Sequence, residues 1–104
     1  MPDIQHYCDA IAAAFHPRRI ILFGSHASGR PKTDSDVDVL VVMPASRRPL
    51  RRMATQIRQK IAADFPVDIL VRSETDIARR IEDRESFILD VTENGRVMYE
   101  AGHS

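Results

Sequence analysis

The sequence is poor in several residues that mark particular classes of protein. It has one cysteine, Cys8, no tryptophan, and only 6% aromatic residues among its 104 positions. A single cysteine excludes an internal disulfide. No apolar run approaches the ~20 residues of a membrane-spanning helix, so no membrane partner is expected. The first ten residues lack the basic start and apolar run of a signal peptide, and we therefore expect a cytoplasmic protein.

The chain also lacks an excess of either charge, with 15 basic and 15 acidic residues. The charges are nevertheless unevenly placed, because residues 1–60 carry ten Lys/Arg and five Asp/Glu, whereas residues 61–104 carry five and ten. A basic surface beside a carboxylate cluster suits a polyphosphate ligand. A solvated helix face explains the arginines equally well; these are Arg47, Arg48, Arg51 and Arg52.

The apolar content of 43% and the length indicate one compact domain over residues 1–104. Periodicity predicts helices over about 3–15, 47–64, from Ser73 through Ile81, and 85–93. Strands are expected at 19–23, 37–43 and 67–71, with a further short strand possible from Arg96. A polar loop containing at most one helical turn separates the first two strands.

This order, α-β-(turn)-β-α-β-α-α, indicates an α/β (α+β) fold with helices packed against a small mixed sheet. The short link between the first two strands favours an antiparallel pair. A full helix joins the second and third strands, which should therefore be parallel.

Three aspartates fall at the starts of neighbouring strands. Asp36 and Asp38 lie two residues apart and should face one side of the second strand, while Val37 and Val39 face the other. Asp68 begins the next, parallel strand and can stand beside Asp38. Converging carboxylates suit Mg²⁺, which takes oxygen ligands and substrate phosphates. Considered alone, Asp36 could be an ordinary turn residue, and Asp68 could form a structural ion pair. Considered as a set, we interpret the three aspartates as metal ligands.

A Gly-Ser turn precedes this cluster at Gly24 and Ser25. The run from Gly24 to Arg30 partly matches a phosphate-binding P-loop, but Arg30 replaces the required lysine and Pro31 the required hydroxyl residue, so we reject that interpretation. Glycine permits a sharp turn and close ligand approach, and the following turn presents backbone N–H groups to a phosphate. Ser25 could equally be a plain helix N-cap.

Taken together, the segment LFGSHASGRPKTDSDVDVLVV and the strand-borne Asp68 resemble the nucleotidyltransferase superfamily of the DNA polymerase β type. The segment is similar to its minimal members, the MNT domains, over residues 20–71. The resemblance implies the nucleotidyltransferase fold and transfer of a nucleoside monophosphate from a nucleoside triphosphate to a hydroxyl group. It assigns the triphosphate to Gly24 and Ser25, and metal binding and catalysis to Asp36, Asp38 and Asp68.

The resemblance further implies ATP as substrate and two Mg²⁺ ions, with Mn²⁺ as a possible replacement. Many MNT domains act as antitoxins beside a HEPN-type toxin protein encoded nearby, and can adenylylate its tyrosine. Relatives often carry arginines after Gly-Ser, where this chain has His26 and Ser28; Arg30 could supply that charge. His26 could be a catalytic base, although a plain loop histidine is the preferred interpretation.

Other functions remain open at this point. The chain could neutralise a partner by contact alone in a hetero-oligomer, or transfer a nucleotide to a small molecule or RNA. Direct nucleic-acid binding is disfavoured because residues 47–58 have no interleaved aromatic residues for base stacking. The apolar C-terminal residues could form an interface or pack on the domain's own core; these are Phe87, Ile88, Val91, Val97 and Met98.

Overall fold

The computed structural model describes residues 2–29, 36–45 and 49–102. Along these residues the elements follow in the order α1 (Pro2–Phe15), β1 (Arg19–Phe23), β2 (Val37–Met43), α2 (Met53–Lys60), β3 (Val67–Ser73), α3 (Glu74–Glu82), α4 (Ser86–Asn94) and β4 (Arg96–Glu100). The described helices include none that is long and apolar enough to cross a membrane.

The strands form a mixed sheet in the order β3-β2-β1-β4. β1 pairs antiparallel with β2, and β2 pairs parallel with β3, as the connection lengths predicted. β4 confirms the further short strand expected from Arg96, and it pairs antiparallel with the outer side of β1. The mixed sheet of the predicted fold class is therefore confirmed.

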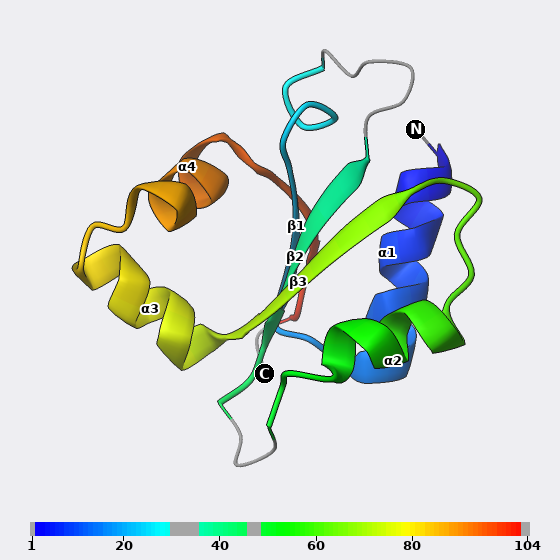
Figure 1. Ribbon diagram of the computed structural model, residues 1–104, viewed down its shortest axis with the longest axis horizontal. Helices are drawn as coiled ribbons and strands as arrows, with labels where there is room; N and C mark the ends of the chain where they lie inside the picture. Colours follow the sequence, from blue (N-terminus) through cyan, green and yellow to red (C-terminus); the bar gives the residue numbers. More distant parts are fainter. Residues whose placement is uncertain (1, 30–35, 46–48, 103–104) are drawn as a thin grey trace.

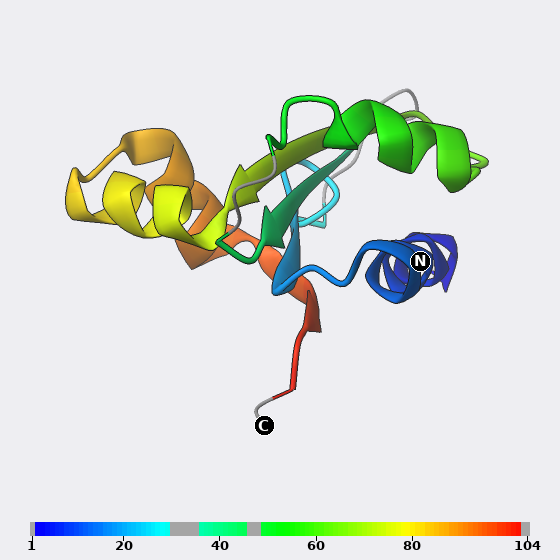
Figure 2. The same ribbon diagram turned by 90° about the horizontal axis from the view of Figure 1, so that it is seen from below.

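Helices cover both faces of this sheet. α1 and α2 lie on one face and α3 and α4 on the other, as the two views show (Figures 1 and 2). Alternate side chains of the strands accordingly enter two separate apolar clusters, one under each pair of helices. β2 lies inside the sheet with both faces covered, which explains its nearly continuous run of apolar residues.

The second helix is much shorter than the periodicity predicted. The expected helix over 47–64 is observed only at Met53–Lys60, and residues 46–48 lie outside the described part of the chain. The described residues 49–52 are not helical, and Arg52 is the N-cap of α2. At the other end, Ile61 is already extended, with φ −113° and ψ 114°. Residues 61–66 form the connection between the end of α2 and the start of β3, and so they cannot continue the helix.

α3 begins at the N-cap that the sequence predicted. The Ser73 hydroxyl accepts a hydrogen bond from the Asp76 N–H at 3.0 Å. Ser73→Ala should lower the free energy of unfolding by about 1 kcal/mol because that N–H loses its partner. Urea unfolding measures the change. Ser86→Ala is the matched control, since α4 begins without a side-chain cap; equal losses in both variants would contradict the assignment.

The C-terminal apolar residues divide between core and surface. Ile88 and Val91 are buried against the sheet, and Met98 packs against the cluster beneath α1. Phe87 and Val97 remain exposed at 43% and 54%. Packing on the domain's own core therefore accounts for three of these five residues.

Candidate active site

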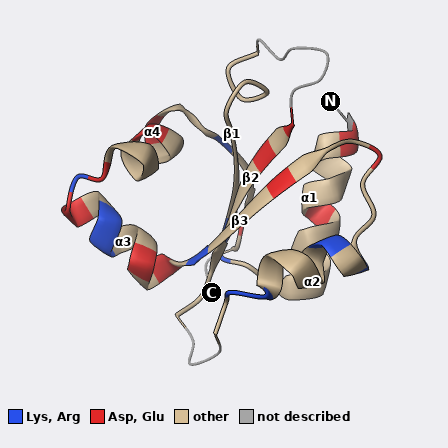
Figure 3. Ribbon diagram, in the orientation of Figure 1, with Lys and Arg blue, Asp and Glu red and all other residues tan. Residues whose placement is uncertain are grey.

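Two aspartates stand side by side at the starts of the parallel strands. Asp38 and Asp68 are register partners, each the second residue of its strand. Figure 3 shows acidic positions together on β2 and β3, toward the end of the sheet that carries the turn after β1. Asp36 directly precedes β2 and is exposed. The predicted neighbourhood of Asp38 and Asp68 is thus confirmed, while their role stays a prediction.

The alternation of β2 decides which face carries the carboxylates. Val37 and Val39 are buried beneath α1 and α2. Asp38 shares the opposite face with Leu40, on the side of α3 and α4. Its cross-strand partner is Phe23 of β1, whose ring meets that of Phe87 edge-to-face at 5.5 Å. Asp38 therefore lies between an aromatic pair and the second carboxylate.

The Gly24 turn packs directly against Asp38. Gly24 has φ +77°, and a Cβ atom there would lie closer than 3.0 Å to Asp38 Oδ2. Its carbonyl accepts hydrogen bonds from the N–H groups of Ala27 and Ser28 at 3.1 and 3.2 Å, which forms a helical turn. Glycine is required here for its backbone conformation and for the space that Asp38 occupies.

The electrostatics of the site centre on Asp38. Burial raises the pKa of the Asp38 carboxyl group, and the charges of Asp68 and Asp36 raise it further, while His26 acts in the opposite direction. Asp38 is therefore repelled by both of the other predicted carboxylates in the folded chain. A cation among them would relieve that repulsion.

The donor atoms fit a hard divalent cation, because all three side chains supply carboxylate oxygens. A ready-made cage is not formed: within residues 2–29, 36–45 and 49–102, no group of three or more His, Cys, Asp or Glu side chains could hold a metal ion. We therefore treat Asp36, Asp38 and Asp68 as groups that could hold a cation after side-chain adjustment.

Arg58 is a member of the site that sequence reasoning missed. Its Nη2 atom lies 3.6 Å from Asp68 Oδ1 and donates a 3.5 Å hydrogen bond to the Val67 carbonyl. Arg58 precedes Asp68 by ten residues on a different element, and no sequence spacing links them. Arg52, at the other end of α2, lies about 9 Å earlier along the helix direction, so α2 brings Arg58 rather than Arg52 to Asp68.

The remaining predicted residues surround the turn. Ser25 follows Gly24 and is partly buried, and its carbonyl accepts a 2.9 Å hydrogen bond from the Ser28 hydroxyl. His26 lies in the same turn, near enough to affect Asp38 electrostatically. Arg30, proposed from sequence to contact the nucleotide, lies outside the described residues.

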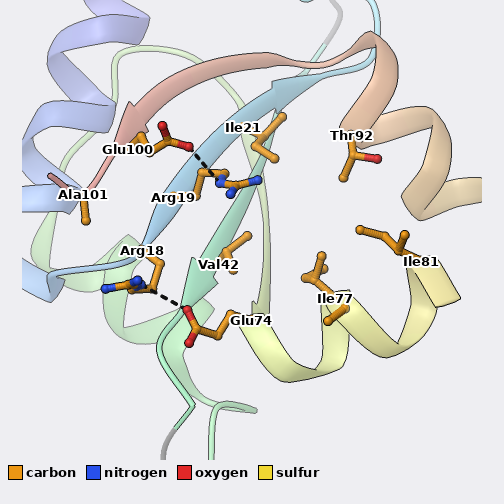
Figure 4. Close-up of a pocket in the computed structure, with 11 residues that line it drawn as sticks. Arg18, Arg19, Ile21, Val42, Glu74, Ile77, Ile81, Thr92, Glu100 and Ala101 are labelled. Carbon is orange, nitrogen blue, oxygen red and sulfur yellow. Dashed lines mark hydrogen bonds and ion pairs between the residues drawn. The ribbon is translucent and has the colours of Figure 1, made fainter. Parts of the chain in front are cut away.

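A separate pocket lies farther along the same sheet face (Figure 4). It has a volume of about 260 Å³, an apolar floor that includes Ile21, Val42 and Ile77, and ion pairs Arg18–Glu74 and Arg19–Glu100 at its rim. Val42 follows Asp38 by four residues, or about 13 Å of strand. None of the predicted site residues in the described part of the chain lines this pocket, so it is distinct from the carboxylate site.

The raised pKa of Asp38 predicts a pH dependence in chelator-treated protein. The folded state binds the proton of the Asp38 carboxyl group more tightly than the unfolded chain, in which the pKa of this group is near 3.8. The resulting stabilisation should be present at low pH and be lost as the pH rises through the folded pKa. Urea unfolding of wild type and Asp38→Asn across this range measures it. The unfolding free energy of wild type minus that of Asp38→Asn should fall as the pH rises, because only wild type carries the titrating carboxyl group; a constant value would contradict the prediction.

Comparison with known proteins gives consistent matches. A family model described as a nucleotidyltransferase domain matches residues 8–97. A Methanocaldococcus jannaschii protein named "Putative protein adenylyltransferase MJ0604" is 31% identical over 98 residues, which cover 92% of this chain and 94% of that protein.

Two solved structures share the fold. A "putative nucleotidyltransferase" from Sulfolobus solfataricus has a TM-score of 0.64 at 20% identity, covering 95% of this chain and 78% of the other. A structure titled "toxin-antitoxin with AMP-PNP" has a TM-score of 0.56 at 19% identity, covering 93% and 73%.

Proposed function

Because the chain belongs to the nucleotidyltransferase domain family, whose model matches residues 8–97, we propose that it is an antitoxin that transfers AMP from ATP to a hydroxyl group of a partner protein. The carboxylate pair Asp38 and Asp68, side by side in parallel register and packed against the Gly24 turn, carries this proposal. The name of the M. jannaschii relative supports a protein acceptor, and the AMP-PNP-bound toxin–antitoxin neighbour supports a toxin partner. We assign that partner to the HEPN type and the acceptor to a tyrosine.

The reaction joins the acceptor oxygen to the α-phosphorus of ATP. The bond from that phosphorus to the bridging oxygen of the β-phosphate breaks, and pyrophosphate leaves. Asp68 takes the proton of the acceptor hydroxyl, and the backbone of Gly24 and Ser25 holds the triphosphate. Asp36, Asp38 and Asp68 would hold two Mg²⁺ or Mn²⁺ ions, which when bound neutralise charge on the attacking and leaving oxygens.

Intact-mass measurement tests this function directly. The purified chain is mixed with ATP, Mg²⁺ and the protein encoded next to it, and both proteins are weighed. The partner should gain one or more AMP units, and EDTA should prevent the gain. Peptide mapping then identifies the modified residue, which should be a tyrosine. Without any gain but with a stable complex, neutralisation by contact would replace the catalytic proposal.

A further inference from the structure

Arg58 reaches the carboxylate site around the open side of β3. α2 packs on the sheet face opposite to Asp68, since Ile57 lies in the cluster beneath α1 and α2. Asp68 instead shares its face with Leu70, which belongs to the other cluster. β3 is the outer strand of the sheet, so its edge leaves a path for the arginine side chain.

The Arg58 guanidinium lies beside the Asp68 carboxylate, which a bound cation would need as a ligand. It lies 3.6 Å from Asp68 Oδ1, and Asp68 is the register partner of Asp38. A divalent cation held by Asp38 and Asp68 would both use this carboxylate and repel the arginine. The two positive groups therefore compete for Asp68.

On the basis of the proposed function, we propose that Arg58 competes with the cation for the Asp68 carboxylate. Arg58 holds the Asp68 carboxylate before cation binding, and moves away when Asp68 turns toward Asp38 and the cation. The absence of a three-ligand cage among the described residues is consistent with an Asp68 that is engaged by Arg58. Arg58 is in this sense a positioning residue that sets the cation concentration at which the site assembles.

The strength of the contact suits such an exchange. Both side chains are substantially exposed, 46% for Arg58 and 68% for Asp68. Exposed ion pairs of this kind are weak, so a cation can displace the arginine at little cost. The 3.5 Å hydrogen bond to the Val67 carbonyl gives Arg58 a second contact that does not depend on Asp68.

Mn²⁺ binding to the nucleotide-free protein provides the test, read from the electron paramagnetic resonance signal of free Mn²⁺. Arg58→Met should bind Mn²⁺ about two- to fivefold more tightly than wild type, the change expected for loss of one exposed ion pair. Lys60→Met is the matched control. It removes one positive charge from an exposed position of α2 that lies on another side of the helix from Arg58. It should change the affinity much less.

The dependence on Asp68 separates competition from a general charge effect. In an Asp68→Asn background, adding Arg58→Met should no longer tighten Mn²⁺ binding. The proposal is overturned if Arg58→Met leaves the affinity unchanged or weakens it, if Lys60→Met has an equal effect, or if the tightening persists without Asp68. Because no ATP or partner is present, these results are independent of whether AMP transfer to a protein occurs.

Discussion

Asp38→Asn should reduce AMP transfer by about two to three orders of magnitude while leaving the fold intact. The loss is the size expected when one group that stabilises transition-state charge is removed. Asparagine keeps the shape of the side chain beside Gly24 but removes the charge that Asp68 and Asp36 repel. Without metal, the variant should therefore be at least as stable as wild type. Intact-mass assays and urea unfolding in EDTA measure the two effects.

Asp64→Asn provides the control for this substitution. It removes one carboxylate from an exposed position between α2 and β3, outside the carboxylate pair. Both its transfer rate and its unfolding free energy should stay near the wild-type values. An Asp38→Asn protein that retains full transfer would disprove the central role given to Asp38, whereas one that unfolds would instead assign Asp38 a structural role.

Gly24→Ala should damage both stability and activity. An alanine at φ +77° costs about 1–2 kcal/mol of backbone strain. Its Cβ atom would also meet Asp38 Oδ2 closer than 3.0 Å, so either the turn or the carboxylate must move. Because the contacted oxygen is at the end of a side chain that can rotate, we expect a further loss of about 0.5–1.5 kcal/mol from a displaced Asp38 rotamer, together with severe loss of AMP transfer. Urea unfolding and intact-mass assays measure these losses.

Gly29 separates the two costs. It has a similar φ of +76°, but a Cβ atom there would meet none of the residues that the structure describes within 4 Å. Gly29→Ala should therefore show the backbone strain alone, with cation binding by Asp38 preserved. In an Asp38→Ala background, the cost of Gly24→Ala should fall to the Gly29→Ala value because the carboxylate is gone. Equal stability losses at Gly24 and Gly29 in the wild-type background would contradict the predicted contact with Asp38.

Regular patterns made most of the elements predictable. Strand alternation placed Val37 and Val39 on one face and Asp38 on the other, since side chains of an extended chain alternate. The Ser73 cap was also readable, because a cap requires only residues three positions apart. The predicted helix over 47–64 was too long, because its end depends on a distant strand. Apolar spacing alone cannot tell where the chain must leave a helix to reach the next strand.

The site divides in the same way between local and long-range contributions. The Gly24-Ser25 turn, the spacing of Asp36 and Asp38, and the placement of Asp68 on the next strand are properties of short segments, and the primary structure was enough to identify the family. The contact of Asp38 with Gly24 and the ion pair of Arg58 with Asp68 depend on sheet pairing and on the path of α2. Such contacts join residues 14 and ten positions apart on different elements, where no backbone periodicity relates them. Only packing of the whole chain brings those groups together.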